Sequence, residues 1–258
     1  MKRLFSLALF TLSFSAHAAN VESSVLKTAR GESVPVDLHL PAEDKAPVLI
    51  MAPGGNYHKE NAIFTLAAER ATKAGIAVLR MDWAYCKRDP NTNRCTGKYS
   101  EDLVPETEDL ETVVDFVKTH PRLDPKSIIL SGKSLGTLVG YKVFQKRPED
   151  FRSLALLTPL CSETDDVLRS ICEKSYPNFE SIKKPVLFLI GSLDRAATYL
   201  PHLWEFLAKK DQGNVSVSVV GGDHGLLIDT SVAASQEPNA RNLNLAIDSL
   251  IAWVHRNL

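Results

Sequence analysis

The sequence predicts an α/β fold in which a mostly parallel, doubly wound sheet carries helices on both faces. Short apolar runs with strand character, such as residues 47–51 and 186–190, alternate with stretches whose apolar residues recur at the helical spacing. Alternation of strands and helices along a chain is typical of a parallel sheet. The 258 residues and the 44% hydrophobic content suit one such domain over residues 19–258.

Residues 1–18 have the pattern of an export signal. Lys2 and Arg3 precede an apolar run over residues 4–14, which is followed by the small-residue sequence Ala16-His17-Ala18. The run is too short to cross a bilayer as a helix, so we expect no stable membrane insertion. We predict cleavage near Ala18 and a periplasmic or secreted protein; a buried first helix is the alternative interpretation.

Charge and cysteine content narrow the class of protein further. Removing Lys2 and Arg3 leaves 28 basic against 31 acidic residues, which argues against a nucleic-acid partner. Four cysteines fit an exported protein with two disulfides, and pairing between sequence neighbours would join Cys86 to Cys95 and Cys161 to Cys172. A zinc site is the alternative, but the C-x-x-C and H-E-x-x-H spacings are missing, so we expect no metal.

The first half of the predicted domain begins with an antiparallel hairpin at the edge of the sheet. Residues 34–40 alternate between apolar and polar side chains, and Arg30-Gly31-Glu32 supplies a turn before them. The fully apolar run 47–51 is typical of a central parallel strand. Gly75 ends the helical pattern that follows. The expected elements are strands over 24–28, 34–40, 47–51 and 76–81, a helix over 63–74, and a loop over 86–100.

The second half continues the alternation. Apolar residues at the i, i+3, i+4 and i+7 positions from Leu110 mark a buried helix face that should end near Pro121. The irregular stretch 158–184 is predicted to be an insertion over the carboxyl edge of the sheet, with a small cap over 161–184. The other expected elements are strands over 127–131, 154–157, 186–190 and 215–220, and helices over 135–146, around 203–207, and over 243–254.

Polar side chains follow three of these strands, at Ser134, Asp194 and His224. Ser134 lies in Gly132-Lys133-Ser134-Leu135-Gly136, a G-x-S-x-G motif that places the serine on a tight, strained turn between a strand and a helix. Gly132 and Gly136 allow neighbouring backbone to approach this turn. Gly136 and Gly140 share the side of the following helix where close packing on the sheet needs small residues.

These three residue types are the components of a nucleophilic site. A serine hydroxyl needs a base to take its proton as it attacks, and histidine suits that role at neutral pH. A buried carboxylate then fixes the tautomer of the imidazole and stabilises its charged form. The order Ser134, Asp194, His224 along the chain is the order expected of an α/β-hydrolase.

From residue 34 to the end, the sequence resembles the dienelactone hydrolase-like group of α/β-hydrolases. The resemblance rests on the G-x-S-x-G motif, on Gly191-Ser192-Leu193-Asp194 and on Gly222-Asp223-His224-Gly225. It implies an oxyanion hole made by the backbone N–H of Leu135 and by a second N–H in Gly54-Gly55-Asn56, where Gly55 is preferred over Asn56. Pro53 stands where the family usually has histidine.

Each candidate also has an ordinary structural interpretation. Ser134 could be a turn serine, and Asp194 could be the N-cap of a helix beginning at residue 195. Asp223 is a rival acid, but an adjacent residue normally points away from its neighbour's ring. A P-loop ending at Gly132-Lys133-Ser134 is excluded because Ser127 stands where that motif needs glycine.

The aromatic residues Tyr57, Trp83 and Tyr85 are candidates for the lining of the substrate pocket. The alternative is packing at the rim, under the loop closed by the Cys86–Cys95 disulfide. Both predicted disulfides lie in loops at the carboxyl edge of the sheet, so they should hold the rim of the pocket.

The sequence therefore predicts an exported serine hydrolase that cleaves a small-molecule carboxylic ester through an acyl-enzyme. Ser134 would attack, His224 would transfer the proton and Asp194 would orient His224, without a metal or organic cofactor. A peptidase or amidase with the same triad is the alternative within enzymes. A catalytically silent protein that uses the fold for binding is the alternative outside them.

Overall fold

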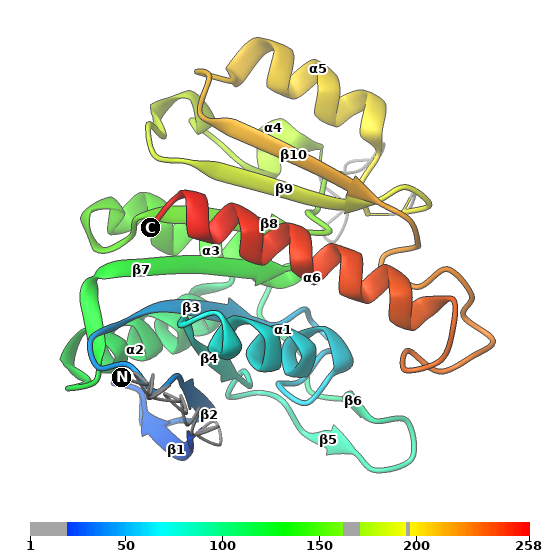
Figure 1. Ribbon diagram of the computed structural model, residues 1–258. Helices are drawn as coiled ribbons and strands as arrows, with labels where there is room; N and C mark the ends of the chain where they lie inside the picture. The colour runs from blue at the N-terminus through cyan, green and yellow to red at the C-terminus, as the bar shows by residue number, and fades with distance from the viewer. Residues whose placement is uncertain (1–19, 162–170, 195–196) are drawn as a thin grey trace, which may run out of the picture.

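One sheet with helices on both faces forms the body of the protein (Figure 1). The computed structural model describes residues 20–161, 171–194 and 197–258, so the predicted signal peptide over residues 1–18 lies outside the described residues. In the described part of the chain the sheet has eight strands in the order β1-β2-β4-β3-β7-β8-β9-β10. These are β1 Asn20–Lys27, β2 Ser33–Leu40, β3 Ala46–Ala52, β4 Ala77–Met81, β7 Leu123–Lys133, β8 Ser153–Leu157, β9 Val186–Gly191 and β10 Val215–Val220.

Strand directions confirm the predicted mixed sheet. The hairpin of β1 and β2 pairs Ser24 with Val36, and β2 is also antiparallel to β4. All pairs from β4 through β3, β7, β8 and β9 to β10 are parallel. The carboxyl ends of the parallel strands therefore meet along one edge, which is where ligands bind in such sheets.

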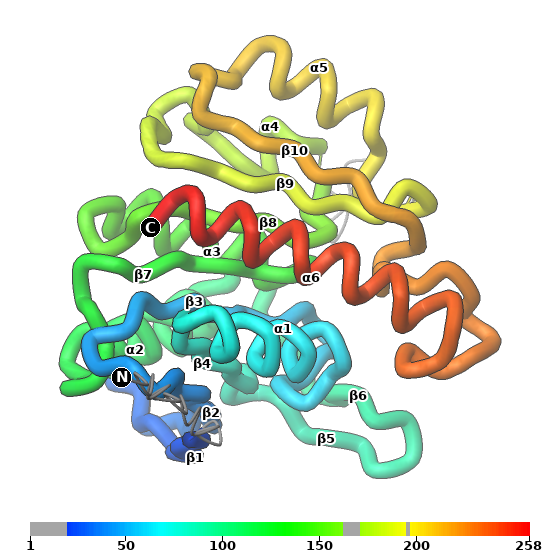
Figure 2. Tube along the Cα trace, in the orientation of Figure 1, coloured from blue at the N-terminus to red at the C-terminus, as the bar shows by residue number. Residues whose placement is uncertain are grey.

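Helices cover the two faces in separate groups (Figures 1 and 2). One face carries α1 Ala62–Lys73 and α6 Asn239–Arg256, whose apolar sides share a core cluster with the sheet. The other carries α2 Val104–Thr119, α3 Leu135–Lys146 and α5 Leu200–Lys210. Three short helical segments complete the described chain: η1 Pro148–Asp150, α4 Cys172–Ser175 and η2 Phe179–Ser181.

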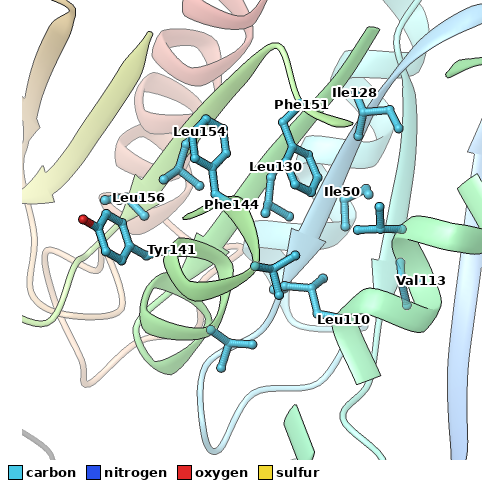
Figure 3. Packing of buried hydrophobic residues seen from close by; sticks show 14 of the residues in the cluster. Ile50, Leu110, Val113, Ile128, Leu130, Tyr141, Phe144, Phe151, Leu154 and Leu156 are labelled. Carbon is cyan, nitrogen blue, oxygen red and sulfur yellow. The ribbon is translucent and has the colours of Figure 1, made fainter. Parts of the chain in front are cut away.

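The central strands supply both cores because successive side chains point to opposite faces. Ile50 and Leu130 belong to the cluster under α2 and α3, shown in Figure 3. Their neighbours Leu49 and Ile129 belong to the cluster under α1 and α6. Burial of each such side chain contributes about 1.5–3 kcal/mol relative to exposure in water. Continuous apolar runs in the sequence are therefore the signature of strands buried on both faces.

The structure differs from the sequence-based expectations in several places. The loop predicted over 86–100 contains a two-stranded hairpin, β5 Arg88–Asp89 and β6 Arg94–Cys95. The strand predicted over 127–131 begins earlier, at Leu123, and the α2 helix begins at Val104 with Pro105 in its first turn, a position that tolerates proline. No helix among the described residues is long and apolar enough to span a membrane.

The segment predicted as a small cap over 161–184 is described only in part, because residues 162–170 lie outside the described residues. Its described portion contributes to the core. Tyr176 and Phe179 are almost completely buried and pack against the rings of Tyr141, Phe188 and Phe206. This portion therefore joins α3 to β9 and α5.

Candidate active site

Ser134 occupies the sharp turn between β7 and α3. Its backbone angles, φ 53° and ψ −118°, lie in a region that residues other than glycine rarely adopt. A Cβ atom added at Gly132 would lie 2.0 Å from the carbonyl oxygen of Gly136, and one added at Gly136 would lie 2.4 Å from the oxygen of Ala52. Both glycines of the motif are therefore required by backbone packing around the serine.

Asp194 and His224 are brought into direct contact at the carboxyl edge. The Oδ2 atom of Asp194 lies 2.7 Å from Nδ1 of His224. Asp194 is only 3% exposed, and its Oδ1 atom accepts a hydrogen bond of 3.2 Å from the N–H of Ala197. The same carboxylate thus accepts the N–H of Ala197 and contacts the histidine ring. It is not the N-cap of a described helix, because α5 begins only at Leu200 and has Tyr199 at its N-cap.

Asp223, the alternative to Asp194 as the carboxylate that orients His224, has a different role. Its Oδ1 atom accepts hydrogen bonds from the N–H groups of Gly225, at 2.8 Å, and Leu227, at 2.9 Å. These bonds fold the loop around His224. Asp223 therefore orders the backbone on which His224 is carried, while Asp194 contacts the ring.

The surroundings of His224 favour its neutral form. Burial lowers the pKa of His224, and the positive charge of Lys133 lowers it further, whereas Asp194 and Asp223 oppose the shift. Because a carboxylate can only accept, we assign the proton of the neutral ring to Nδ1, which leaves the Nε2 lone pair available. Among the hydrogen bonds of the described residues none joins His224 to Ser134, a contact that often forms only in complex with substrate.

The loop after β3 lies beside the serine. A Cβ atom at Gly54 would lie 3.1 Å from Cβ of Ser134. The carbonyl oxygen of Gly54 accepts a 3.1 Å hydrogen bond from the N–H of Tyr57, and the oxygen of Gly55 accepts a 2.9 Å bond from the hydroxyl of Tyr85. These contacts fix the peptide planes of the segment that the sequence assigns to the oxyanion hole.

The three aromatic residues predicted to line the pocket have three different positions. Tyr57 lines a groove of about 540 Å³ beside His224. Trp83 is completely buried and donates from Nε1 to the oxygen of Pro53 at 3.0 Å. It therefore holds the start of the loop after β3 and does not line the pocket. Tyr85 lines a separate cavity of about 700 Å³. Other residues of the groove beside His224 are Asn56, Ile63, Thr92, Arg94, Leu227 and Leu243.

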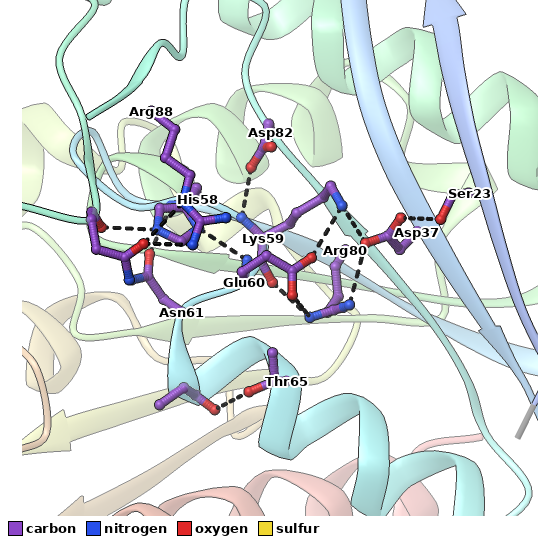
Figure 4. A network of polar contacts seen from close by, with 12 residues as sticks. Ser23, Asp37, His58, Lys59, Glu60, Asn61, Thr65, Arg80, Asp82 and Arg88 are labelled. Carbon is purple, nitrogen blue, oxygen red and sulfur yellow. Dashed lines mark hydrogen bonds and ion pairs between the residues drawn. The ribbon is translucent and has the colours of Figure 1, made fainter. Parts of the chain in front are cut away.

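A charged network anchors the far end of the same loop, and it was not among the sequence-based expectations (Figure 4). Lys59 forms an ion pair with Asp37 of β2 and donates its N–H to Asp82 at 2.6 Å. Arg80 of β4 pairs with Asp37 at 3.3 Å and donates to the oxygen of Lys59 at 2.8 Å. Both Asp37 and Arg80 are 5% exposed. Charged residues inside two strand patterns were the sequence signal of this network.

The small hairpin of β5 and β6 is hydrogen-bonded to the loop after β3. The disulfide between Cys86 and Cys95 closes this hairpin, as predicted. The N–H of Cys95 donates to the oxygen of Asn56 at 3.2 Å, and Nε2 of His58 lies 2.9 Å from the oxygen of Asn93. The second predicted disulfide, between Cys161 and Cys172, is also present. Both cysteines are completely buried in the core cluster under α3 and α5, so the expectation that this disulfide holds the rim of the pocket is wrong.

Solved structures of other proteins share the fold of this chain. Dienelactone hydrolase from Anabaena variabilis has 17% identity and a TM-score of 0.66, covering 94% of this chain and 100% of its own. Est1E from Butyrivibrio proteoclasticus has 16% identity and a TM-score of 0.67, covering 91% of this chain and 98% of its own. At these identities the likeness concerns the fold.

No sequence among the curated proteins matches the chain. A family model described as "Alpha/beta hydrolase domain" matches residues 45–255, a range that includes the serine turn, Asp194 and His224. Membership of this family supports hydrolase activity. The chain therefore belongs to the α/β-hydrolase family.

Proposed function

We propose that the protein is a serine hydrolase that cleaves carboxylic esters through an acyl-enzyme intermediate. The observation that carries this proposal is the 2.7 Å contact between Asp194 Oδ2 and His224 Nδ1, made beside the strained turn of Ser134. A turn of this kind exposes the serine oxygen, and the buried carboxylate leaves Nε2 of the ring as the base.

In the proposed reaction, Ser134 Oγ attacks the ester carbonyl while His224 Nε2 takes the hydroxyl proton. Collapse of the tetrahedral intermediate breaks the carbon–oxygen bond to the alcohol, which receives that proton from His224. A water molecule then attacks the acyl-enzyme, with His224 again as the base, and releases the acid and free Ser134. Asp194 stabilises the imidazolium that forms in each step.

The oxyanion would be bound by two backbone N–H groups. Leu135 is the first residue of α3, where N–H groups have no partner within the helix. The N–H of Gly55 belongs to the same planar peptide as the oxygen of Gly54, which faces Tyr57, so this N–H points the opposite way. Loss of one such donor costs about 3 kcal/mol in enzymes where it has been measured.

The groove beside His224 is proposed to hold the substrate. It mixes apolar side chains such as Leu227 and Leu243 with polar ones such as Asn56 and Thr92. Among the structural relatives, Est1E has been solved with ferulic acid bound, and another relative is a dienelactone hydrolase. These relatives and the size of the groove favour a small-molecule ester over a folded protein as substrate.

A fluorophosphonate probe tests the nucleophile. The wild-type protein should be labelled and Ser134→Ala should not be. Ser192→Ala, at an exposed turn on the same edge of the sheet, is the matched control and should be labelled like the wild type. Absence of wild-type labelling, or equal labelling of Ser134→Ala, would contradict the proposal.

Substrate class needs a separate experiment. Acyl esters of graded chain length should be hydrolysed faster than aminoacyl amides of similar size. Faster amide hydrolysis would instead identify a peptidase or amidase, and inertness towards both would favour a binding protein.

Export is part of the same proposal: the two disulfides fit an oxidising compartment, and N-terminal sequencing of the exported protein should find cleavage near Ala18.

A further inference from the structure

Lys133, the residue before the candidate nucleophile, is a lysine buried at the centre of the site. It is only 1% exposed. Its side chain is on the face of β7 that carries Ile129, the face covered by α1 and α6. Lysine is almost never buried so completely without a partner for its charge. Among the ion pairs of the described residues, however, none involves Lys133.

The ammonium group instead contacts three loops at the carboxyl edge of the sheet. It donates to the carbonyl oxygen of His224 at 2.8 Å and to Oγ1 of Thr158 at 3.1 Å. It also lies 4.2 Å from the ring centroid of Tyr57, within the range of a cation–π contact. An ammonium group has three donors, so these contacts account for the whole group in its charged form.

Each of the three contacts belongs to a different part of the candidate site. Tyr57 follows the proposed oxyanion segment, and its N–H closes the turn at Gly54. Thr158 follows β8 and has φ 44°, a conformation that a β-branched residue adopts only when its surroundings hold it there. Lys133 binds the backbone carbonyl of His224, and Asp194 binds its ring.

We propose that Lys133 is a positioning residue, which fixes the loop of His224 relative to the serine turn and keeps a positive charge beside the imidazole. The proposal rests on the proposed function, because positioning matters for catalysis only if Ser134 and His224 react together. Lys133 is adjacent to Ser134 in the chain, so any movement of the turn is transmitted to the backbone of His224. A lysine is required because an apolar residue would leave the oxygens of His224 and Thr158 without these donors.

The charge has a distinct and measurable consequence. The charged groups that act on His224 in the described chain are Lys133 from β7, Asp194 from the loop after β9 and Asp223 from its own loop, and Arg94 lines the same groove. Lys133 lowers the pKa of His224, and removal of this charge should raise it. A lysine that only filled space or stabilised the fold would leave the titration of His224 unchanged.

The test compares Lys133→Met, which keeps the volume of the stem, with Lys133→Gln, which keeps a hydrogen-bond donor group but removes the charge. Lys184→Met is the matched control, since Lys184 also donates two hydrogen bonds, in its case to the backbone carbonyls of Pro148 and Phe151, before the amino end of β9. The titration of the His224 ring is followed by nuclear magnetic resonance, with His224→Gln for assignment. kcat and KM are measured against pH with the best ester.

We expect both Lys133 variants to titrate His224 at higher pH than the wild type, and the acid limb of kcat/KM to move in the same direction. Misplacement of His224 should lower kcat about 10- to 100-fold, with a smaller change in KM and a greater loss in the Met variant than in the Gln variant. Lys184→Met should show neither effect, whatever its loss of stability.

An unchanged His224 titration in the two Lys133 variants would overturn the proposal, even if their activity fell, because the loss would then be structural. If Lys133→Met does not fold, Lys133→Gln gives the same comparison. The ring titration requires no turnover, so it tests Lys133 separately from the proposed function. Failure of the proposed function would show itself as a wild-type protein that the fluorophosphonate does not label.

Discussion

Asp194 and His224 meet because two neighbouring parallel strands end at the same level. The register of β9 and β10 pairs Gly191 with Val220, and the turns that follow are hydrogen-bonded to each other through Leu193 N–H and the oxygen of Gly222, at 2.8 Å. Two residues separated by 30 positions in the chain are thereby fixed 2.7 Å apart. Rigid placement of this kind lets a carboxylate orient an imidazole without loss of conformational entropy during the reaction.

Substitution Asp194→Asn should lower kcat by about 10³- to 10⁴-fold while the fold is retained, because an amide donor would favour the wrong tautomer of His224. Steady-state kinetics and the urea midpoint check the two parts of this prediction. Asp223→Asn is the matched control. The amide oxygen can still accept from Gly225 and Leu227, so its loss of kcat should be far smaller. Equal losses in both variants would contradict the assignment of the acid.

Activity should require the neutral form of His224, so kcat/KM should rise with pH and its acid limb should have a midpoint below 6.5, the usual pKa of the group. Burial and Lys133 lower this pKa in the folded protein. As pH falls, the unfolded chain therefore takes up a proton on this residue at a higher pH than the folded protein does. The contribution of His224 to the free energy of unfolding is complete above pH 6.5 and decreases as pH falls towards the pKa of His224 in the folded protein. The pH dependence of kcat/KM, measured with a neutral ester, tests the expected position of the acid limb. An acid limb with a midpoint above pH 6.5 would contradict this prediction.

The sequence predicted the sheet well because its signals are local. Continuous apolar runs identified β3 and β9, and the helical spacing from Leu110 identified α2. The turn of Ser134 and the contact of Asp194 with His224 followed from motifs at strand ends. Their catalytic roles stay predictions until activity is measured.

The supporting contacts could not be predicted because they join residues distant in sequence through long side chains. Periodicity gives no reason for Lys133 to reach His224, or for Arg80 to reach Asp37. Gly136 and Gly140 illustrate the same limit: the expectation that both are needed for close packing is wrong for Gly140, since a Cβ atom there would meet only Leu130, at 3.9 Å. Sequence spacing gives the face of a helix but not the distance to its neighbour.

Removal of the first disulfide by Cys86→Ser with Cys95→Ser should reduce activity as well as stability. The chain-entropy model gives a loss of about 2–3 kcal/mol for a loop of this length. The β5–β6 hairpin also donates to the oxygen of Asn56, so its loosening should free the proposed oxyanion segment and lower kcat/KM about tenfold. Urea unfolding and kinetics at a temperature where the variant stays folded measure the two losses.

The double variant Cys161→Ser with Cys172→Ser calibrates this prediction, because its disulfide closes a loop of similar length, with a separation of 11 residues against 9. Its loss of stability should be comparable. If the Cys86 and Cys95 variant lost stability but kept wild-type kcat/KM, the hairpin would have no role in holding the oxyanion segment.

Two glycines one turn apart in α3 should respond oppositely to alanine. In Gly136→Ala the new Cβ would lie 2.4 Å from the oxygen of Ala52 and 2.7 Å from that of Pro53, and backbone atoms cannot move aside locally. The variant should lose about 1–3 kcal/mol of stability, and also activity, because β3 leads directly into the loop of Gly54 and Gly55. Gly140→Ala meets ordinary van der Waals contact and gains the helix propensity of alanine, so it should be more stable by up to about 1 kcal/mol with unchanged kcat/KM.

Urea midpoints and kcat/KM for these two variants test the packing around the serine turn directly. Both changes add one methyl group to the same helix, so the difference between them isolates the backbone contact of Gly136 from helix propensity. Equal stability of the two variants would mean that the turn can move away from β3 without cost. In that case the strained conformation of Ser134 would not be held by the approach of α3 to Ala52, and its support would have to come from the hydrogen bond of its own N–H to the oxygen of Leu157, at 3.0 Å.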